Sequence, residues 1–235
     1  LYKSGTGGAE WTKVTIDPVA RDSPCTVADA WDPQLTGHRM VVLSGWQLLV
    51  VGGGLSKVYR SENIKGSRWS EVASETAFGR RYEPAVAVDS QDNVFLIGGH
   101  DGYINESNAF NKVYKDAYFS TDYGATWTSF SLKLADQHVL NHAKISVTMT
   151  SDDTLFLFAD DTMYMAHYNL GSSPSFSFTA VSKAEGGRAI GGFGLVTDVY
   201  NQIYVMGGRA SLSDLAGRSD IISMATNRDT NCAIQ

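Results

Sequence analysis

The residues best suited to recognition lie in one polar segment, residues 100–111, between apolar stretches. Its candidate binding residues are His100, Asp101, Tyr103, Asn105 and Phe110. Exposed Tyr and Asn side chains suit stacking on, and hydrogen bonding to, a sugar ring. A solvated connecting loop is the interpretation that we favour for this segment, and a lip that binds a glycan or a protein partner through these five residues is the alternative.

Two pairs of adjacent carboxylates could serve glycoside hydrolysis or hold Ca²⁺. Asp152–Asp153 has the composition of a turn between two strands, which explains the pair without chemistry. For Asp160–Asp161 we favour a role in a loop. Five arginines at predicted strand starts or just after predicted strands could clamp a substrate carboxylate: Arg39, Arg80, Arg81, Arg188 and Arg209.

No metal site and no cofactor are predicted. The five histidines show neither an HExxH motif nor spacing with paired cysteines. Cys25 and Cys232 lie near opposite ends of the chain and could form one disulfide. Two small buried residues, or a bond to another molecule, are the alternatives.

Charge and hydropathy exclude two classes of partner. The net charge is −6, and there is no run of Lys and Arg, which argues against nucleic acid. No apolar run approaches the length that spans a bilayer, so we expect no membrane insertion. The triplet Asn105-Glu106-Ser107 would accept a glycan in a secreted protein, and we predict a secreted protein, with the cytoplasm as the alternative.

A repeat organises the chain. Four apolar stretches occupy corresponding places, and three of them end in a Gly-Gly pair: residues 48–53, 94–99, 155–160 and 203–208. The positions Gly52, Gly98, Ala159 and Gly207 are 46, 61 and 48 residues apart. Units of this length with four strands each predict an all-β propeller of antiparallel four-stranded blades.

A second pattern marks the turn between the last two strands of a unit. Ser120, Asp122, Gly124, Thr126 and Trp127 have the types and spacing of a tight hairpin turn, with an Asp to accept backbone N–H groups and a Gly for positive φ. The pattern resembles the Asp-box, or BNR repeat, of sialidase-like propellers, and the Gly-Gly units resemble kelch repeats. The resemblance implies the propeller fold and leaves the function open, because the Asp-box lies on the outer rim of such propellers.

We predict one domain over residues 1–235, with a partial blade at about 1–16 and complete blades at about 38–76, 82–133, 143–183 and 189–235. Either the first blade has two strands, or the blades belong to a ring of six or seven. In kelch-like repeats an arginine at the start of the first strand bonds neighbouring blades, and we favour that role for Arg39, Arg81 and Arg188.

From these features we predict a non-catalytic binding or structural module for a protein or glycan, a candidate member of a larger assembly, rather than an enzyme. The alternative is a sialidase-type glycoside hydrolase with an arginine-lined central pocket. The resemblance to sialidases implies an Arg-Ile-Pro motif, which this chain lacks. The kelch-like copper-radical oxidases need a Tyr cross-linked to a Cys, and neither cysteine has a suitable place.

Overall fold

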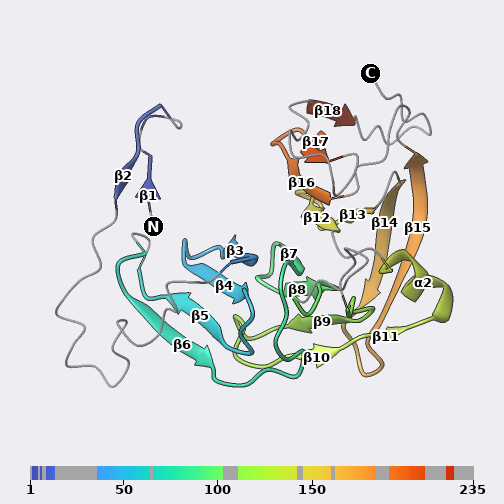
Figure 1. The fold of residues 1–235 in the computed structure, drawn as a ribbon, viewed down its shortest axis with the longest axis horizontal. Helices are drawn as coiled ribbons and strands as arrows, with labels where there is room; N and C mark the ends of the chain where they lie inside the picture. Colours follow the sequence, from blue (N-terminus) through green and yellow to red (C-terminus); the bar gives the residue numbers. More distant parts are fainter. Residues whose placement is uncertain are drawn as a thin grey trace.

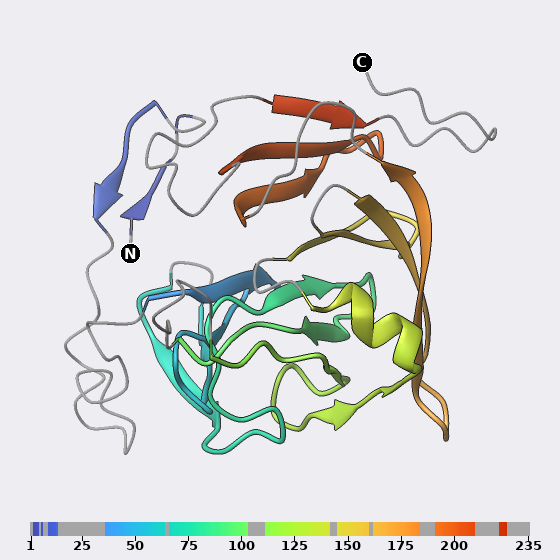
Figure 2. The ribbon, with the colours of Figure 1, turned by 45° about the vertical axis from the view of Figure 1, so that its right-hand side comes forward.

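A computed structural model describes residues 2–4, 6, 9–13, 36–63, 66–102, 111–141, 145–159, 162–183, 191–209 and 221–224. These residues form mainly antiparallel sheets with one short helix, α2 (Leu134–Val139), so the predicted all-β propeller fold is confirmed. Figure 1 shows the larger sheets fanned about an axis, and Figure 2 shows the same fan turned about the vertical axis, so that its right-hand side comes forward.

Two sheets have the four-stranded order of a propeller blade. The first consists of β3 (His38–Val42), β4 (Leu48–Gly52), β5 (Val58–Ser61) and β6 (Trp69–Ala73). The second consists of β7 (Ala85–Val88), β8 (Val94–Ile97), β9 (Ala117–Ser120) and β10 (Thr128–Ser129).

The third sheet is joined to the second by a short strand. It contains β12 (Ser146–Met149), β13 (Leu155–Ala159), β14 (Thr162–Asn169) and β15 (Ser175–Lys183), and β11 (Ser131–Leu132) pairs with β15 in parallel. The last residues of the predicted unit 82–133 therefore extend the next sheet. Within the described ranges, two smaller sheets are β16 (Gly191–Thr197), β17 (Ile203–Arg209) and β18 (Ile221–Met224), and β1 (Tyr2–Lys3) with β2 (Thr12–Lys13). The number of blades stays a prediction.

The first strand of each larger sheet lies toward the middle of the fan. β3 contacts β7, β7 contacts β12, and β12 contacts β16. The second strands are apolar at every position, because both of their faces are covered, and Val94, Phe95, Leu96 and Ile97 of β8 are fully buried. Each first strand has one end at the hairpin to the second strand, and in the first two sheets the other end lies beside a Gly-Gly pair.

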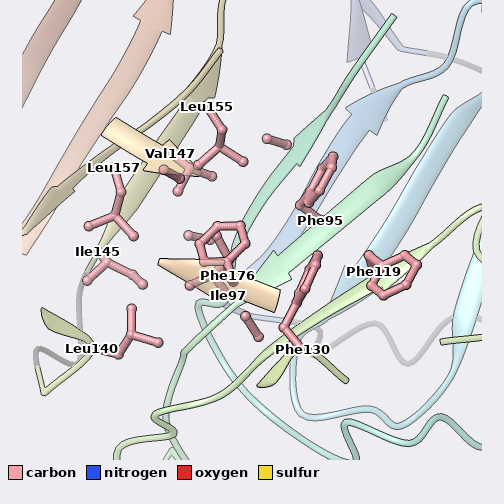
Figure 3. Packing of buried hydrophobic residues seen from close by; sticks show 14 of the residues in the cluster. Phe95, Ile97, Phe119, Phe130, Leu140, Ile145, Val147, Leu155, Leu157 and Phe176 are labelled. Carbon is pink, nitrogen blue, oxygen red and sulfur yellow. The ribbon is translucent and has the colours of Figure 1, made fainter. Parts of the chain in front are cut away.

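The largest apolar cluster joins the second and third sheets. Phe95 and Phe119 of the second sheet pack against Phe130, which contacts Phe176 of β15 at 5.0 Å between ring centroids. Figure 3 shows these rings beside the aliphatic side chains of β12 and β13. Burial of such side chains is the main force holding neighbouring blades together.

The turn at residues 120–127 closes on its own side chains. Asp122 accepts hydrogen bonds from the backbone N of Thr126 at 2.8 Å and from its hydroxyl at 2.6 Å. Ser120 Oγ accepts the N–H of Gly124 at 2.9 Å, and Trp127 Nε1 donates to Gly124 O at 3.0 Å. Trp127 is 8% exposed and belongs to the core between the first two sheets.

The turn at residues 61–69 uses the same contacts with an amide in place of the carboxylate. The N–H of Ser67 donates to Asn63 Oδ1 at 3.2 Å, and Trp69 Nε1 donates to Gly66 O at 2.7 Å. Within the described part of the chain, no helix has the length and apolar character needed to cross a membrane.

Candidate active site

We call the two ends of the first strands the turn end and the glycine end. The turn end is formed by the hairpins at residues 43–47, 89–93, 150–154 and 198–202. The glycine end is formed by residues 37, 52–54, 82–84 and 98–102, where the second strands stop and the first strands begin. Side chains at the two ends face different loops.

At the turn end, polar groups of neighbouring hairpins form hydrogen bonds with one another. The N–H and hydroxyl of Ser44 donate to the carboxylate of Asp92 at 2.7 and 2.5 Å. Ser90 contacts Asp153 in the same way at 2.7 and 2.6 Å. The N–H of Ser151 donates to Asn201 Oδ1 at 2.8 Å, so the bond repeats from sheet to sheet.

A cleft of about 360 Å³ opens at the turn end. Its polar lining includes Asp89, Asp153 and Asp198, whose carboxylates already accept bonds from their own or neighbouring turns. Burial, and then the charges of Asp89 and Asp153, raise the pKa of Tyr168 to about 12. The carboxylates that line the cleft thus hold the hairpin turns together. Asp152–Asp153 lies in one of these turns, as its composition indicates.

The glycine end holds a glutamate in an unusual conformation. Glu83 has φ 48°, and it precedes Pro84, a placement that normally favours extended backbone. The other left-handed non-glycine residues among those described lie in hairpin turns: Trp46, Asp92, Tyr123, Asp153 and Asn201. The N–H of Glu83 donates to Gly37 O at 2.7 Å, and a side chain at Gly37 would come within 3.1 Å of Glu83 Cγ.

An imidazole lies beside the Glu83 carboxylate. His100 Nε2 is 3.6 Å from Glu83 Oε2, longer than a hydrogen bond but close enough for strong attraction if the ring is charged. The His100 side chain is 6% exposed and that of Glu83 is 31% exposed. Water can therefore reach the carboxylate while the imidazole is held within the protein.

An aromatic ring forms the wall next to this pair. The ring of Tyr82 stacks on that of His100, with 6.0 Å between centroids and 15° between planes. Tyr82 and His100 also exchange backbone hydrogen bonds of 2.8 and 3.0 Å. The ring fills the space left by Gly54 and Gly102, since a Cβ on either residue would come within 2.4 Å of it.

The arginines of the described ranges contact protein groups. Arg81 is fully buried and donates to Asp116 Oδ1 at 2.8 Å and to Gly98 O at 2.9 Å. Arg80 Nε donates to Gly54 O at 2.7 Å, and Arg39 donates to His38 O at 3.4 Å. Arg188 lies outside the described residues, and Arg209 is described only as part of β17. Arg81 ties the glycine end together rather than reaching into solvent.

Two of the predicted binding residues belong to the glycine end. His100 is next to Glu83, and the N–H of Asp101 donates to Lys112 O at 3.1 Å. The other sequence candidates fall outside the described residues: Tyr103, Asn105, Phe110, Cys25, Cys232, Asp160 and Asp161. The described residues contain no group of three or more His, Cys, Asp or Glu side chains that could hold a metal ion.

Sequence reasoning missed Glu83, although the repeat contains a signal for it. Glu83 lies fifteen residues before Gly98, and Gly37 lies fifteen residues before Gly52. In the first sheet this left-handed position is a glycine with φ 68°, and in the second it is a glutamate. An alignment of the units at their glycine pairs would have shown that Glu83 stands where the first unit has Gly37.

Comparisons with known proteins agree with the fold. No family model matches the chain, and a search of curated proteins gave no match. A fungal alcohol oxidase of the AA5 family, in complex with copper, has 14% identity and a TM-score of 0.55, over 86% of this chain and 41% of that one. A gluconolactonase from Xanthomonas campestris has 11% identity and a TM-score of 0.53, over 83% of this chain and 60% of that one.

The prediction of a non-catalytic binding or structural module is wrong in view of these comparisons, because both of the solved structures named above are enzymes. The sequence reasoning treated the missing Arg-Ile-Pro motif as an argument against catalysis. That motif bears on sialidases alone, and a propeller carries its chemistry in loops that differ between enzyme classes. The likeness itself establishes the fold, and this chain spans 41% and 60% of those two proteins.

Proposed function

We propose that this chain is the catalytic part of a β-propeller hydrolase in which Glu83 acts as the general base. The observation that carries the proposal is the left-handed backbone of Glu83 at a position where the first sheet has Gly37. A residue with a side chain is less stable than glycine there by roughly 1 kcal/mol. Strain of this kind clusters at active sites, which supports a functional reason for the glutamate.

Glu83 has the surroundings that a general base needs. Its carboxylate is partly exposed, so a water molecule can approach it, and the imidazole of His100 and the ring of Tyr82 lie on its protein side. In the proposed step the carboxylate accepts a proton from water as the water oxygen attacks an ester carbonyl carbon. The C–O bond to the leaving oxygen then breaks, that oxygen takes up the proton, and a hydroxy acid is released.

Sugar lactones are the proposed substrate class, since one protein with this fold is by its title a gluconolactonase. A sialidase-type glycoside hydrolase needs a cluster of arginines at its pocket. Here Arg81 is fully buried against Asp116, and Arg80 and Arg39 donate to backbone carbonyls. Hydrolysis by one carboxylate therefore agrees better with the described side chains.

Kelch and Asp-box repeats are the finer family assignment that we propose. The Gly-Gly pairs and the hydrogen bonds of Ser120, Asp122 and Thr126 support it. Secretion, a glycan at Asn105, a disulfide between Cys25 and Cys232, and membership of a larger assembly also stay predictions.

Substitution of Glu83 by glutamine tests the proposal. Glutamine keeps the size of the side chain but cannot accept a proton from water, so kcat/KM for aldonolactones should fall about 10²–10⁴-fold. Proton release in a pH-stat measures the rate, and circular dichroism checks the fold. The matched control is Glu75→Gln at an exposed position, which should change the rate less than about twofold. Equal rates for the native protein and Glu83→Gln would exclude Glu83 as the base.

A further inference from the structure

The hydrogen bonds of His100 determine where its proton lies. The backbone N–H of Gly102 donates to His100 Nδ1 at 3.0 Å, so this nitrogen is an acceptor and carries no proton. In the neutral ring the proton is therefore on Nε2, the nitrogen that faces Glu83 Oε2 at 3.6 Å. The neutral His100 ring thus directs Nε2–H toward the Glu83 carboxylate and the lone pair of Nδ1 toward the N–H of Gly102.

Protonation of His100 would change both contacts at once. A proton on Nδ1 would point at the N–H of Gly102, and two donors cannot share a hydrogen bond. The charged ring would also attract the carboxylate of Glu83 into an ion pair, which makes the carboxylate a weaker base. Protonation of His100 would thus break the hydrogen bond from Gly102 and turn the Glu83 carboxylate from water to the charged ring.

We infer that His100 is a positioning residue for Glu83 and an acid-sensitive switch that turns this site off. The inference rests on the proposed role of Glu83. With the neutral ring, Nε2–H orients the carboxylate, and the bond from Gly102 keeps the ring in the required tautomer. With the charged ring, the same side chain holds the carboxylate in an unreactive pair.

The groups around His100 have mixed charge. The segment before β7 brings the Tyr82 ring and the Glu83 carboxylate, Asp101 follows His100 in the chain, and Lys112 precedes Val113, which bridges to His100.

Two substitutions separate the two contacts of the ring. In His100→Asn the amide oxygen can replace Nδ1 and accept from Gly102, but the shorter side chain has no N–H in the place of Nε2–H. In His100→Gln the amide nitrogen can replace Nε2 and donate to Glu83, but the acceptor for Gly102 is lost. Neither amide titrates, so both variants should lose the acid limb that His100 gives to the pH profile of kcat/KM. His100→Asn should also be slower than His100→Gln by about tenfold at neutral pH.

Hydrogen exchange at the Gly102 amide tests the proposed switch without any assay of catalysis. The hydrogen-exchange protection factor of this amide should fall when acidification of the native protein protonates His100. It should stay high at every pH in His100→Asn and low at every pH in His100→Gln. The control is the amide of Gly98, which donates to Asp116 O at 3.0 Å and should not change.

The two proposals fail in different ways. A Gly102 protection factor that is independent of pH in the native protein, or the same acid limb in His100→Gln as in the native protein, would overturn the switch. The role of Glu83 would survive either result. Conversely, if no lactone is hydrolysed, the proposed function fails and Gly102 exchange still decides whether His100 controls this loop.

Discussion

The first and second four-stranded sheets share one plan, and they differ most at the glycine end. Both have the strand order of a blade and a hairpin turn closed by a tryptophan. Two corresponding positions are Gly37 and Gly54 in the first sheet, but Glu83 and His100 in the second. The residues proposed to carry the chemistry are thus those in which the second repeat departs from the first.

The glycines of the first sheet are also needed by the second. Gly37 leaves room for the Glu83 side chain, and Gly54 leaves room for the ring of Tyr82. The site is therefore made at a contact between two repeats, where one supplies space and the other supplies functional groups. Exchanging residues between the sheets tests this division directly.

Glu83→Gly gives the second sheet the residue of the first and should have the largest effect. Turnover of the lactone should fall about 10²-fold or more, because the proposed base is removed. The free energy of unfolding should rise by about 0.5–1 kcal/mol, because glycine adopts φ 48° without strain. Urea unfolding and the pH-stat assay measure the two changes. A loss of more than 1 kcal/mol would make Glu83 a structural residue instead.

The repeat itself was predictable, because a fold built from copies repeats its local signals. The apolar second strands, the Gly-Gly pairs and the turn at residues 120–127 all come from short-range patterns of strand and turn residues. The bonds from Ser44 to Asp92 and from Ser90 to Asp153 were not foreseen, since they join residues 48 and 63 positions apart. Short helix α2 was missed because its six residues carry little periodicity.

The site was harder to predict than the fold for a similar reason. His100 was noted for its polar segment, but its importance depends on Glu83, which lies seventeen residues earlier and is brought beside it by the pairing of Tyr82 with His100. The functional role of Glu83 is inferred from its positive φ, which the amino-acid composition does not reveal. For Arg81 the favoured expectation was a structural bond between neighbouring blades rather than a substrate clamp, and the structure places its side chain fully buried against Asp116.

Gly54→Ala removes the space that the first sheet gives to the second. The new methyl group would lie 2.4 Å from the Tyr82 hydroxyl, at a backbone φ of 80°. The ring cannot move freely, because it stacks on His100 and lies against Gly102 on its other side. We expect a loss of about 1–3 kcal/mol in stability and slower turnover. Gly45→Ala, with nothing within 4 Å of the added methyl, is the control, and an equal loss there would refute the packing explanation.

Asp122→Asn converts the turn of the second sheet to the chemistry of Asn63 in the first, and its effect should be the smallest. Burial alone would raise the pKa of Asp122, but hydrogen bonds from Thr126 and Ser120 lower it below the usual 3.8. The unfolded chain therefore takes up this proton first as the pH falls. The stability that the carboxylate contributes is present above pH 3.8 and is lost as the pH falls through the lowered pKa. The variant should lose about 1 kcal/mol at pH 7 and less at pH 3, measured by urea unfolding against Glu75→Gln. A loss that is equal at both pH values would show that the charge of Asp122 does not contribute to the turn.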